Sequence, residues 1–389
     1  MNRAVVIDCV RTAMGRAHKD RGCYRDVRSD DLAVACVKAL IERTGIDPAE
    51  IEDVLMGNTQ QTKEQGLNVA RAISLMANIP VTAGGATINR LCGSSLQALN
   101  QASHSIAAGA EDVQIVGGLE HMHHLPMDHG LDLNPKLFQA TSKAALHMGI
   151  TAEFLAQTQE ISRHDQDEFA LASHQKAAAA HNSGKFEKEI LPVHGRDEEG
   201  ARYLVKQDQC VREDTSLEAL SALAPAFMPK MGTVTAGNSS PLNDGAAALL
   251  MMSADSATRL GLKPMVEVVA TAVAGVEPSV MGTGPIPATK KVLKRAGLEL
   301  SDIGIIELNE AFASQSLACI RGLGLTPEKV NVNGGAIAIG HPLGASGARI
   351  STTLIHAMVD QNIEYGLATM CIGLGQGIAT IFRLADPSK

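Results

Sequence analysis

The segment "NRLCGSSLQAL", residues 89–99, places Cys92 directly before Gly-Ser-Ser and a stretch with helical spacing. The start of a helix offers unpaired N–H groups and a positive partial charge, which lower the pKa of a nearby thiol and favour its nucleophilic thiolate. We expect Ser94 or Ser95 to cap this helix. A free cysteine is more often a buried apolar residue, but such a residue needs no tight, polar turn after it. Cys92 is therefore the candidate nucleophile.

A second glycine-rich turn, "GGAIAIGHPLGASGARI", carries His341. A histidine in such a loop is less typical of a core residue than one on an apolar helix face, and His341 is a candidate general base for Cys92. Another cysteine, Cys371, ends the last predicted strand within "MCIGLGQGIA". We interpret Cys371 as a proton-transferring thiol and the N–H of Gly373 as half of an oxyanion hole.

Asn309 lies in "ELNEAFA", after a predicted strand. It could hold a water or a substrate oxygen, or it could cap the next helix, and the residues alone leave both open. Four histidines in one irregular segment invite a metal interpretation: His121, His123, His124 and His129. No pattern of acidic ligands accompanies them, so we predict no metal site.

Two thiols, an imidazole and an amide on loops at strand ends suit reversible carbon–carbon cleavage of a 3-oxoacyl thioester. One thiol would hold the acyl group, another acid would protonate the departing carbanion, and two oxyanions would need donors. A cysteine hydrolase could also use Cys, His and Asn, but would release the acyl group to water. A lipid- or acyl-CoA-binding module would leave Cys92 unreactive.

Strands and amphipathic helices alternate along the chain, which is typical of an α/β protein with a largely parallel sheet. The predicted strands are "AVVIDCV", "IEDVLMG", "DVQIVGG", "AALLMMSA", "MVEVVATAVAG", "IGIIELN" and "YGLATMCIG". Ligands of paired α/β halves gather outside the carboxyl ends of the strands, where loops from both halves converge.

One register relates two distant parts of the chain. Setting Gly45 against Gly297, an offset of 252 residues, aligns "KALIERTGIDPAEIEDVLM" with "KVLKRAGLELSDIGIIEL" and also pairs Ser94 with Ser346. We infer a duplication. The predicted domains are an N-terminal half carrying the nucleophile (1–118 with 243–263), an inserted loop domain (119–242) and a C-terminal half (264–389).

The composition excludes several functional classes. The 34 basic and 42 acidic residues give a net charge of −8 without a Lys/Arg-rich block, which argues against nucleic-acid binding. The seven cysteines form no C-x-x-C pair, so neither a disulfide framework nor a zinc site is indicated. No stretch approaches ~18 apolar residues and no signal sequence is evident, so we expect a cytoplasmic protein without a transmembrane segment.

Several motifs together resemble the thiolases: "NRLCGSS", "GTVTAGNSSPLNDGAAA", "NEAFA", "GGAIAIGHPLGASGAR" and "CIGLGQG". The resemblance implies the thiolase fold, with two similar βαβ-type halves in a five-layered α/β/α/β/α arrangement plus a loop domain. It implies that Cys92 is acylated after activation by His341, and that Cys371 protonates the leaving acetyl-CoA carbanion and then deprotonates coenzyme A. One oxyanion hole would comprise His341 and a water held by Asn309, and the other the N–H groups of Cys92 and Gly373.

The same resemblance implies coenzyme A as co-substrate, with no permanently bound cofactor. Arg212 is the candidate for meeting negative charge at the nucleotide end. The residues implied to bind coenzyme A are His147, Met148, Arg212, Phe227, Ala236, Ser240, Met281, Ala311 and Phe312.

Within the family, "GGLEHMHHLPMDHG" and the C-terminal motifs look most like the degradative 3-ketoacyl-CoA thiolases of fatty-acid β-oxidation. That likeness implies a homodimer within an α2β2 complex, whose α subunit is a hydratase/dehydrogenase, acting on 3-oxoacyl-CoA. His147 in "LHMG" is expected of the biosynthetic acetoacetyl-CoA thiolases, which are the alternative. A decarboxylating condensing enzyme would be expected to have His where Cys371 stands.

Overall fold

The computed structural model describes residues 2–385. Its strands are β1 (Ala4–Thr12), β2 (Gly15–Arg16), β3 (Asp53–Gly57), β4 (Ala86–Ile88), β5 (Val113–His121), β6 (Ile190–Leu191), β7 (Val193–Arg196), β8 (Arg202–Val205), β9 (Asn243–Ser253), β10 (Val266–Gly275), β11 (Ile305–Leu308), β12 (Tyr365–Ile372) and β13 (Gln376–Leu384). Its α-helices are α1 (Ser29–Thr44), α2 (Val69–Met76), α3 (Ser94–Ala108), α4 (Leu137–Ala140), α5 (Met148–Thr158), α6 (Arg163–Asn182), α7 (Leu217–Ser221), α8 (Ala254–Leu260), α9 (Pro285–Ala296), α10 (Ala313–Leu323) and α11 (Ser346–Gln361).

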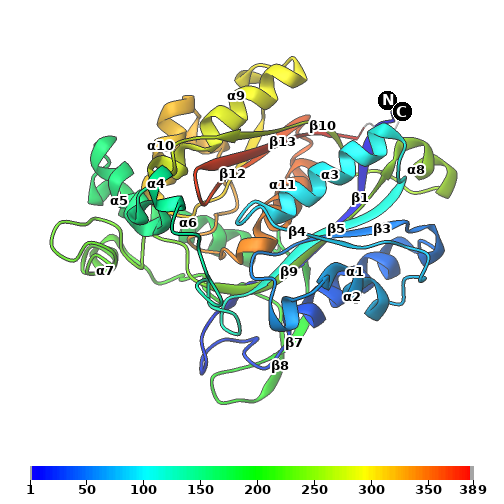
Figure 1. Cartoon of the computed structure of the whole chain (residues 1–389), viewed down its shortest axis with the longest axis horizontal. Helices are drawn as coiled ribbons and strands as arrows, with labels where there is room; N and C mark the ends of the chain where they lie inside the picture. The colour runs from blue at the N-terminus through cyan, green and yellow to red at the C-terminus, as the bar shows by residue number, and fades with distance from the viewer. Residues whose placement is uncertain (1, 386–389) are drawn as a thin grey trace.

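The main sheet has the strand order β11-β12-β13-β10-β1-β9-β5-β3-β4 and consists of two half-sheets. They join at β1 and β10 through only two residue pairs, Val5 with Glu267 and Val6 with Val266. This short junction lets the half-sheets diverge and enclose helices between them. Figure 1 shows α3 and α11 in that central position, with α1 and α2 outside one half-sheet and α9 and α10 outside the other. The predicted five-layered α/β/α/β/α arrangement is confirmed.

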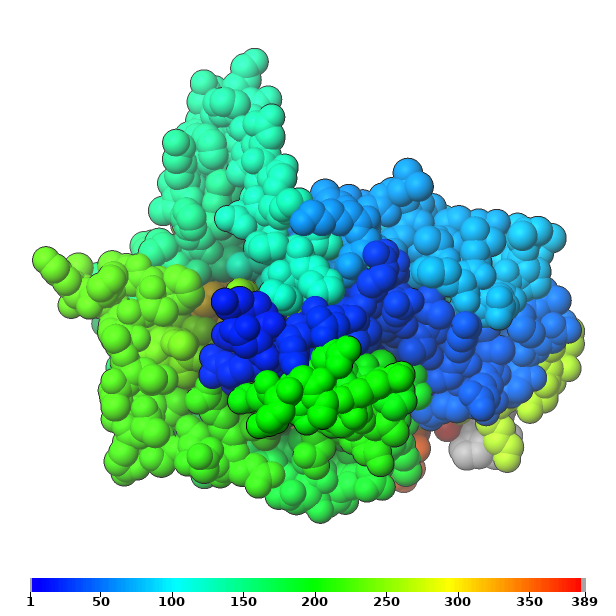
Figure 2. Space-filling view, turned by 90° about the horizontal axis from the view of Figure 1, so that it is seen from below, coloured from blue at the N-terminus to red at the C-terminus, as the bar shows by residue number. Residues whose placement is uncertain are grey.

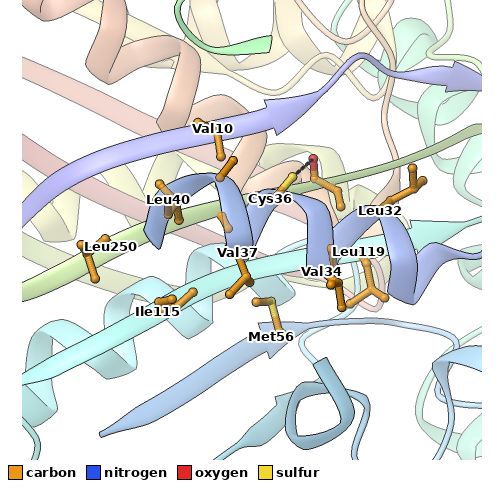
Figure 3. Close-up of a cluster of buried hydrophobic side chains, with 14 of the residues drawn as sticks. Val10, Leu32, Val34, Cys36, Val37, Leu40, Met56, Ile115, Leu119 and Leu250 are labelled. Atoms are coloured by element: carbon orange, nitrogen blue, oxygen red, sulfur yellow. Dashed lines mark hydrogen bonds between the residues drawn. The ribbon is translucent and has the colours of Figure 1, made fainter. Parts of the chain in front are cut away.

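The outer helix α1 illustrates how each layer is held. Its buried face presents Leu32, Val37 and Leu40 to apolar side chains of the half-sheet, which include Ile115 and Leu250 (Figure 3). These side chains are removed from water, and burial of each large one contributes about 1.5–3 kcal/mol before entropy is counted. The helix ends at Gly45, whose left-handed backbone (φ 66°) suits glycine.

The central helices approach closely because a glycine lies at their crossing. A Cβ at Gly347 of α11 would lie 2.3 Å from the backbone nitrogen of Leu96 in α3. The hydroxyl of Ser95 also accepts the backbone N–H of Ala348, at 2.9 Å. The starts of α3 and α11 are thereby fixed side by side, and with them the turns that precede each helix.

The 252-residue offset reappears in the structure. It carries the first residue of α3, Ser94, onto Ser346 of α11, and the first residue of β5, Val113, onto Tyr365 of β12. Gly45 and Gly297 both end their helices in the left-handed conformation. The two halves are therefore structural repeats.

Two sequence expectations about the sheet are wrong. The sheet is not largely parallel, because five of the eight neighbouring pairs in its strand order are antiparallel. The strand that contains Cys371 is not the last, because β13 follows it and pairs antiparallel with both β12 and β10. The glycines of "GLGQG" obscured this hairpin, since they break the apolar pattern at the turn and at the start of β13. No helix within residues 2–385 is both long and apolar enough to cross a bilayer.

Candidate active site

Cys92 lies in the turn before α3 and is half-buried, whereas the other six of the seven cysteines, all within the described residues, are buried. The expected serine cap is wrong. The N-cap is Gly93, and the hydroxyl of Ser94 accepts the N–H of Arg90 and donates to the carbonyl of Leu91. The serines therefore shape the turn and join the two central helices instead of capping α3.

The pKa of Cys92 is raised, whereas the sequence predicted a lowered pKa. Burial raises the pKa of this thiol to about 11, outweighing the backbone N–H groups of Gly373 and of Cys92 itself, which face the sulfur and lower it. The sequence correctly suggested nearby N–H donors but overlooked desolvation by the surrounding layers. Cys92 is thus a neutral thiol at physiological pH and needs a base to become a nucleophile.

His341 has the protonation state that a base requires. Its Nδ1 lies 2.5 Å from the hydroxyl of Ser346, which itself donates to the carbonyl of Pro342 at 2.9 Å. Because that hydroxyl proton is already used, Nδ1–H donates to Ser346 and Nε2 carries no proton. Burial, with a smaller effect from the charge of Arg349, lowers the pKa of His341 to about 3.

Asn309 faces the unprotonated nitrogen of His341. Its amide nitrogen lies 3.5 Å from Nε2, and the side chain is buried. Its Oδ1 is also buried and has no hydrogen-bond partner among the described residues. Asn309 does not cap α10, whose N-cap is Phe312. An unpartnered buried carbonyl beside a base suits a bound water or substrate group.

Cys371 is buried in β12, and the turn after it reaches Cys92. Burial raises the pKa of its thiol well above the usual range, and the charge of the nearby Cys92 raises it further. A Cβ at Gly93, next to Cys92, would lie 2.5 Å from Cδ1 of Ile372. The two sulfurs, from different halves, therefore lie near each other, and the raised pKa keeps Cys371 protonated at physiological pH.

The residues implied to bind coenzyme A fall into two groups. Met148, Met281, Ala311 and Phe312 pack in one apolar cluster with Cys371. Phe227 reaches this cluster, since its ring lies edge-on to that of Phe312 with centroids 6.0 Å apart.

The remaining candidates lie around this cluster. The N–H of Ser240 donates to the carbonyl of Ala311 at 3.0 Å, and His147 is exposed at the N-cap of α5. Arg212 and Ala236 line a separate surface pocket. The candidates therefore lie in two places, around the apolar cluster that includes Cys371 and in this surface pocket.

Sequence reasoning missed three residues that position His341. Ser346 fixes its tautomer, and the side chain of Asn243 accepts its backbone N–H at 2.9 Å. Arg349 is buried and contributes the positive charge described above. Ser346 could have been found, because the repeat paired it with Ser94. Nothing in the sequence links Asn243 to a residue almost 100 positions away.

Replacing Ser346 with alanine is expected to lower kcat/KM about tenfold to a hundredfold, because Nδ1–H loses its acceptor and the ring loses its orientation. Steady-state kinetics would measure this. Ser351→Ala is a matched control, since that buried hydroxyl on the same helix bonds only to the carbonyl of Gly347. Equal losses in both variants would show a general effect on α11.

The pH dependence follows from the two shifted pKa values. With the pKa of Cys92 near 11, its alkylation by iodoacetamide should rise about tenfold per pH unit from pH 6 to 9. A plateau in that range would reveal a thiolate–imidazolium pair instead. Because the pKa of His341 is lowered to about 3, this base stays unprotonated from pH 8 to 5, so kcat/KM should show no acidic limb near 6.5.

The histidine-rich segment serves packing in this structure. His121 is stacked on His124 with ring centroids 3.6 Å apart, and its Nε2 lies 3.1 Å from the carbonyl of Tyr24. His124 lies 3.1 Å from a carboxylate oxygen of Glu64. In the part of the chain that the structure describes, no three His, Cys, Asp or Glu side chains are grouped to hold a metal ion.

Comparisons with known proteins agree with this geometry. Residues 4–255 match the model of the thiolase N-terminal domain, and residues 262–384 match that of the thiolase C-terminal domain. The chain is 55% identical over 387 residues to a 3-ketoacyl-CoA thiolase of Photobacterium profundum, covering 98% of this chain and 100% of that protein. A 3-ketoacyl-CoA thiolase of Aeromonas salmonicida is 54% identical with the same coverage.

Among solved structures, an acetyl-CoA acetyltransferase of Bacillus anthracis superposes with a TM-score of 0.90 at 37% identity, covering 99% of both chains. Both domain models and full-length relatives thus match this sequence, and the chain belongs to the thiolase family.

Proposed function

We propose that this protein is a 3-ketoacyl-CoA thiolase, which uses coenzyme A to cleave 3-oxoacyl-CoA into acetyl-CoA and a shortened acyl-CoA. The observation that carries the proposal is the closeness of two thiols, Cys92 and Cys371, since the charge of the first raises the pKa of the second. The turn that carries the neutral imidazole of His341 precedes α11, whose start is bonded to the start of α3 just after Cys92. A hydrolase would need only one thiol. The cleavage needs the second, because a carbanion must receive a proton as it leaves.

In the first half-reaction, Nε2 of His341 takes the proton of Cys92 while the sulfur attacks the 3-keto carbon. The protonated Nε2 and a water on Oδ1 of Asn309 then donate to the oxyanion. The bond between C2 and C3 breaks, its electron pair passes to C2, and Cys371 protonates C2. Acetyl-CoA leaves, and the shortened acyl group remains on Cys92.

In the second half-reaction, the thiolate of Cys371 takes the proton of incoming coenzyme A. The coenzyme A sulfur attacks the acyl-Cys92 thioester. The oxyanion that forms accepts hydrogen bonds from the N–H groups of Cys92 and Gly373. The thiolate of Cys92 leaves and recovers a proton from His341. Both of these N–H groups already face the Cys92 sulfur in the free protein.

The degradative assignment is supported by 54–55% identity to proteins named 3-ketoacyl-CoA thiolase, against 37% to the acetyl-CoA acetyltransferase. The latter likeness keeps biosynthetic acetoacetyl-CoA synthesis as the alternative. We expect kcat/KM for 3-oxohexadecanoyl-CoA to exceed that for acetoacetyl-CoA, with no cleavage when coenzyme A is omitted. A preference for acetoacetyl-CoA would favour the alternative, and acyl release to water would favour a hydrolase.

We also propose that the chain works in the cytoplasm as a homodimer within an α2β2 complex, with the nucleophile on the half formed by 1–118 and 243–263. Its motifs, similar to those of the degradative enzymes, support the assembly. Co-purification with a hydratase/dehydrogenase α subunit would test it, and a thiolase that stays separate from such a subunit at micromolar concentration would argue against it.

A further inference from the structure

A surface pocket of about 270 Å³ is lined by two of the residues implied to bind coenzyme A, Arg212 and Ala236. Its lining residues include Arg16, His174, Cys210, Arg212, Ala236 and Pro241. Sites that enclose a whole small ligand are usually larger, roughly 300–1,000 Å³. The pocket therefore suits one end of a longer molecule.

The charged residues that line this pocket are all positive. Two arginines line it and no carboxylate does. Within residues 2–385, neither Arg16 nor Arg212 forms an ion pair, whereas Arg196, also in the inserted region, pairs with Asp26 at 2.6 Å. The side chain of Arg16 does contact the buried thiol of Cys210, but neither guanidinium group has a carboxylate partner. Two such groups in a protein of net charge −8 mark a site for an anion.

The two arginines come from distant segments that the fold holds together. Arg16 belongs to β2 and pairs in register with Asn243 of β9, while the backbone N–H of Arg212 donates to Nδ1 of the buried His174 at 3.2 Å. In Figure 2 the dark-blue N-terminal segment lies directly against the green segment of the inserted region. Both backbones are fixed, so their side chains can meet an anion without ordering a loop.

The pocket is linked to the reacting end of the site. Ala236 lines it, and four residues later Ser240 bonds to Ala311, which belongs to the apolar cluster around Cys371. A ligand with its sulfur at Cys371 and its chain along this segment would run toward the pocket that the arginines line.

We propose that Arg16 acts with Arg212 to hold a phosphate group at the nucleotide end of coenzyme A, so that Arg16 is a further determinant of coenzyme A affinity. This inference rests on the proposed function. Guanidinium groups bind phosphate oxygens in pairs of parallel hydrogen bonds, which a single ammonium cannot reproduce. The phosphate is thus bridged between the N-terminal half and the inserted region.

The test compares KM values for coenzyme A. Arg16→Ala should raise KM about tenfold to a hundredfold, with kcat at saturating coenzyme A changing less than twofold, and Arg16→Lys should recover only part of the loss. Lys19→Ala is the matched control, since this exposed cation is three residues away and outside the pocket lining. A change in KM below twofold for Arg16→Ala would overturn the proposal.

Shortened thiol substrates then identify the phosphate. If the effect of Arg16→Ala disappears with dephospho-coenzyme A, the pocket holds the 3′-phosphate; if it disappears only with pantetheine, the pocket holds the diphosphate. Either result supports a phosphate site. An equal effect on KM for pantetheine would contradict it, because that compound carries no phosphate.

Calorimetry with 3′-phospho-ADP separates this inference from the proposed function, because it needs no catalysis. Binding by the wild-type protein that is weakened by Arg16→Ala supports the pocket even if thiolysis is not observed. Normal thiolysis by a wild-type protein whose binding of 3′-phospho-ADP is unaffected by Arg16→Ala would refute the pocket alone.

Discussion

Replacing Cys92 with alanine is expected to abolish thiolysis of 3-oxoacyl-CoA, with kcat falling at least about 10⁴-fold. Removal of a covalent nucleophile has effects of this size or larger in enzymes that act through an acyl intermediate. No other thiol can replace it, because Cys371 is buried and its pKa is raised well above the usual range. Absorbance of the 3-oxoacyl thioester enolate would follow the reaction.

The matched control is Cys36→Ala. Cys36 is fully buried in α1, outside the half-sheet and away from the two sulfurs, so the same substitution removes a core contact without touching the site. It should lower the melting temperature while leaving kcat near the wild-type value. Comparable loss of kcat in both variants would show that folding, rather than a missing nucleophile, explains the result for Cys92.

Replacing Cys371 with alanine is expected to lower kcat for thiolysis about 10²- to 10⁴-fold, the range for a missing general acid. The carbanion of acetyl-CoA would then leave without a proton donor. Transfer of an acetyl group from acetyl-CoA onto Cys92 should persist, because the thiolate of coenzyme A is a good leaving group without an acid. Cys36→Ala again serves as the control, since this buried cysteine lies in α1 and bonds to the carbonyl of Ala246.

Much of the fold could be predicted because periodicity reports it directly. The strands that run from Ala4, Asp53 and Val113 each contain a run of apolar residues, and the strands from Ala4 and Asp53 are followed by segments with helical spacing. The repeat register then related the two halves. β13 was not predicted, because glycines at the turn before it and at its start interrupt the apolar pattern. Its pairing with β10 and β12, which identifies it as a strand, is seen only in the structure.

The site divides in a similar way. Cys92, His341 and Cys371 each stand in an unusual local context, so their chemistry could be proposed from neighbouring residues. The direction of the Cys92 pKa could not, since it depends on how deeply the surrounding layers desolvate the sulfur. Asn243 and Arg16 likewise become meaningful only when β2 pairs with β9 and brings distant segments together.

The division of roles between the two sulfurs is tested most directly by peptide mass spectrometry of the Cys371→Ala variant after incubation with acetyl-CoA. The expected result is a single acetyl group on the peptide that contains Cys92, in a protein that no longer cleaves 3-oxoacyl-CoA. An unmodified Cys92 peptide, or an acetyl group on another cysteine, would contradict the assignment of Cys92 as the acyl carrier and Cys371 as the proton donor.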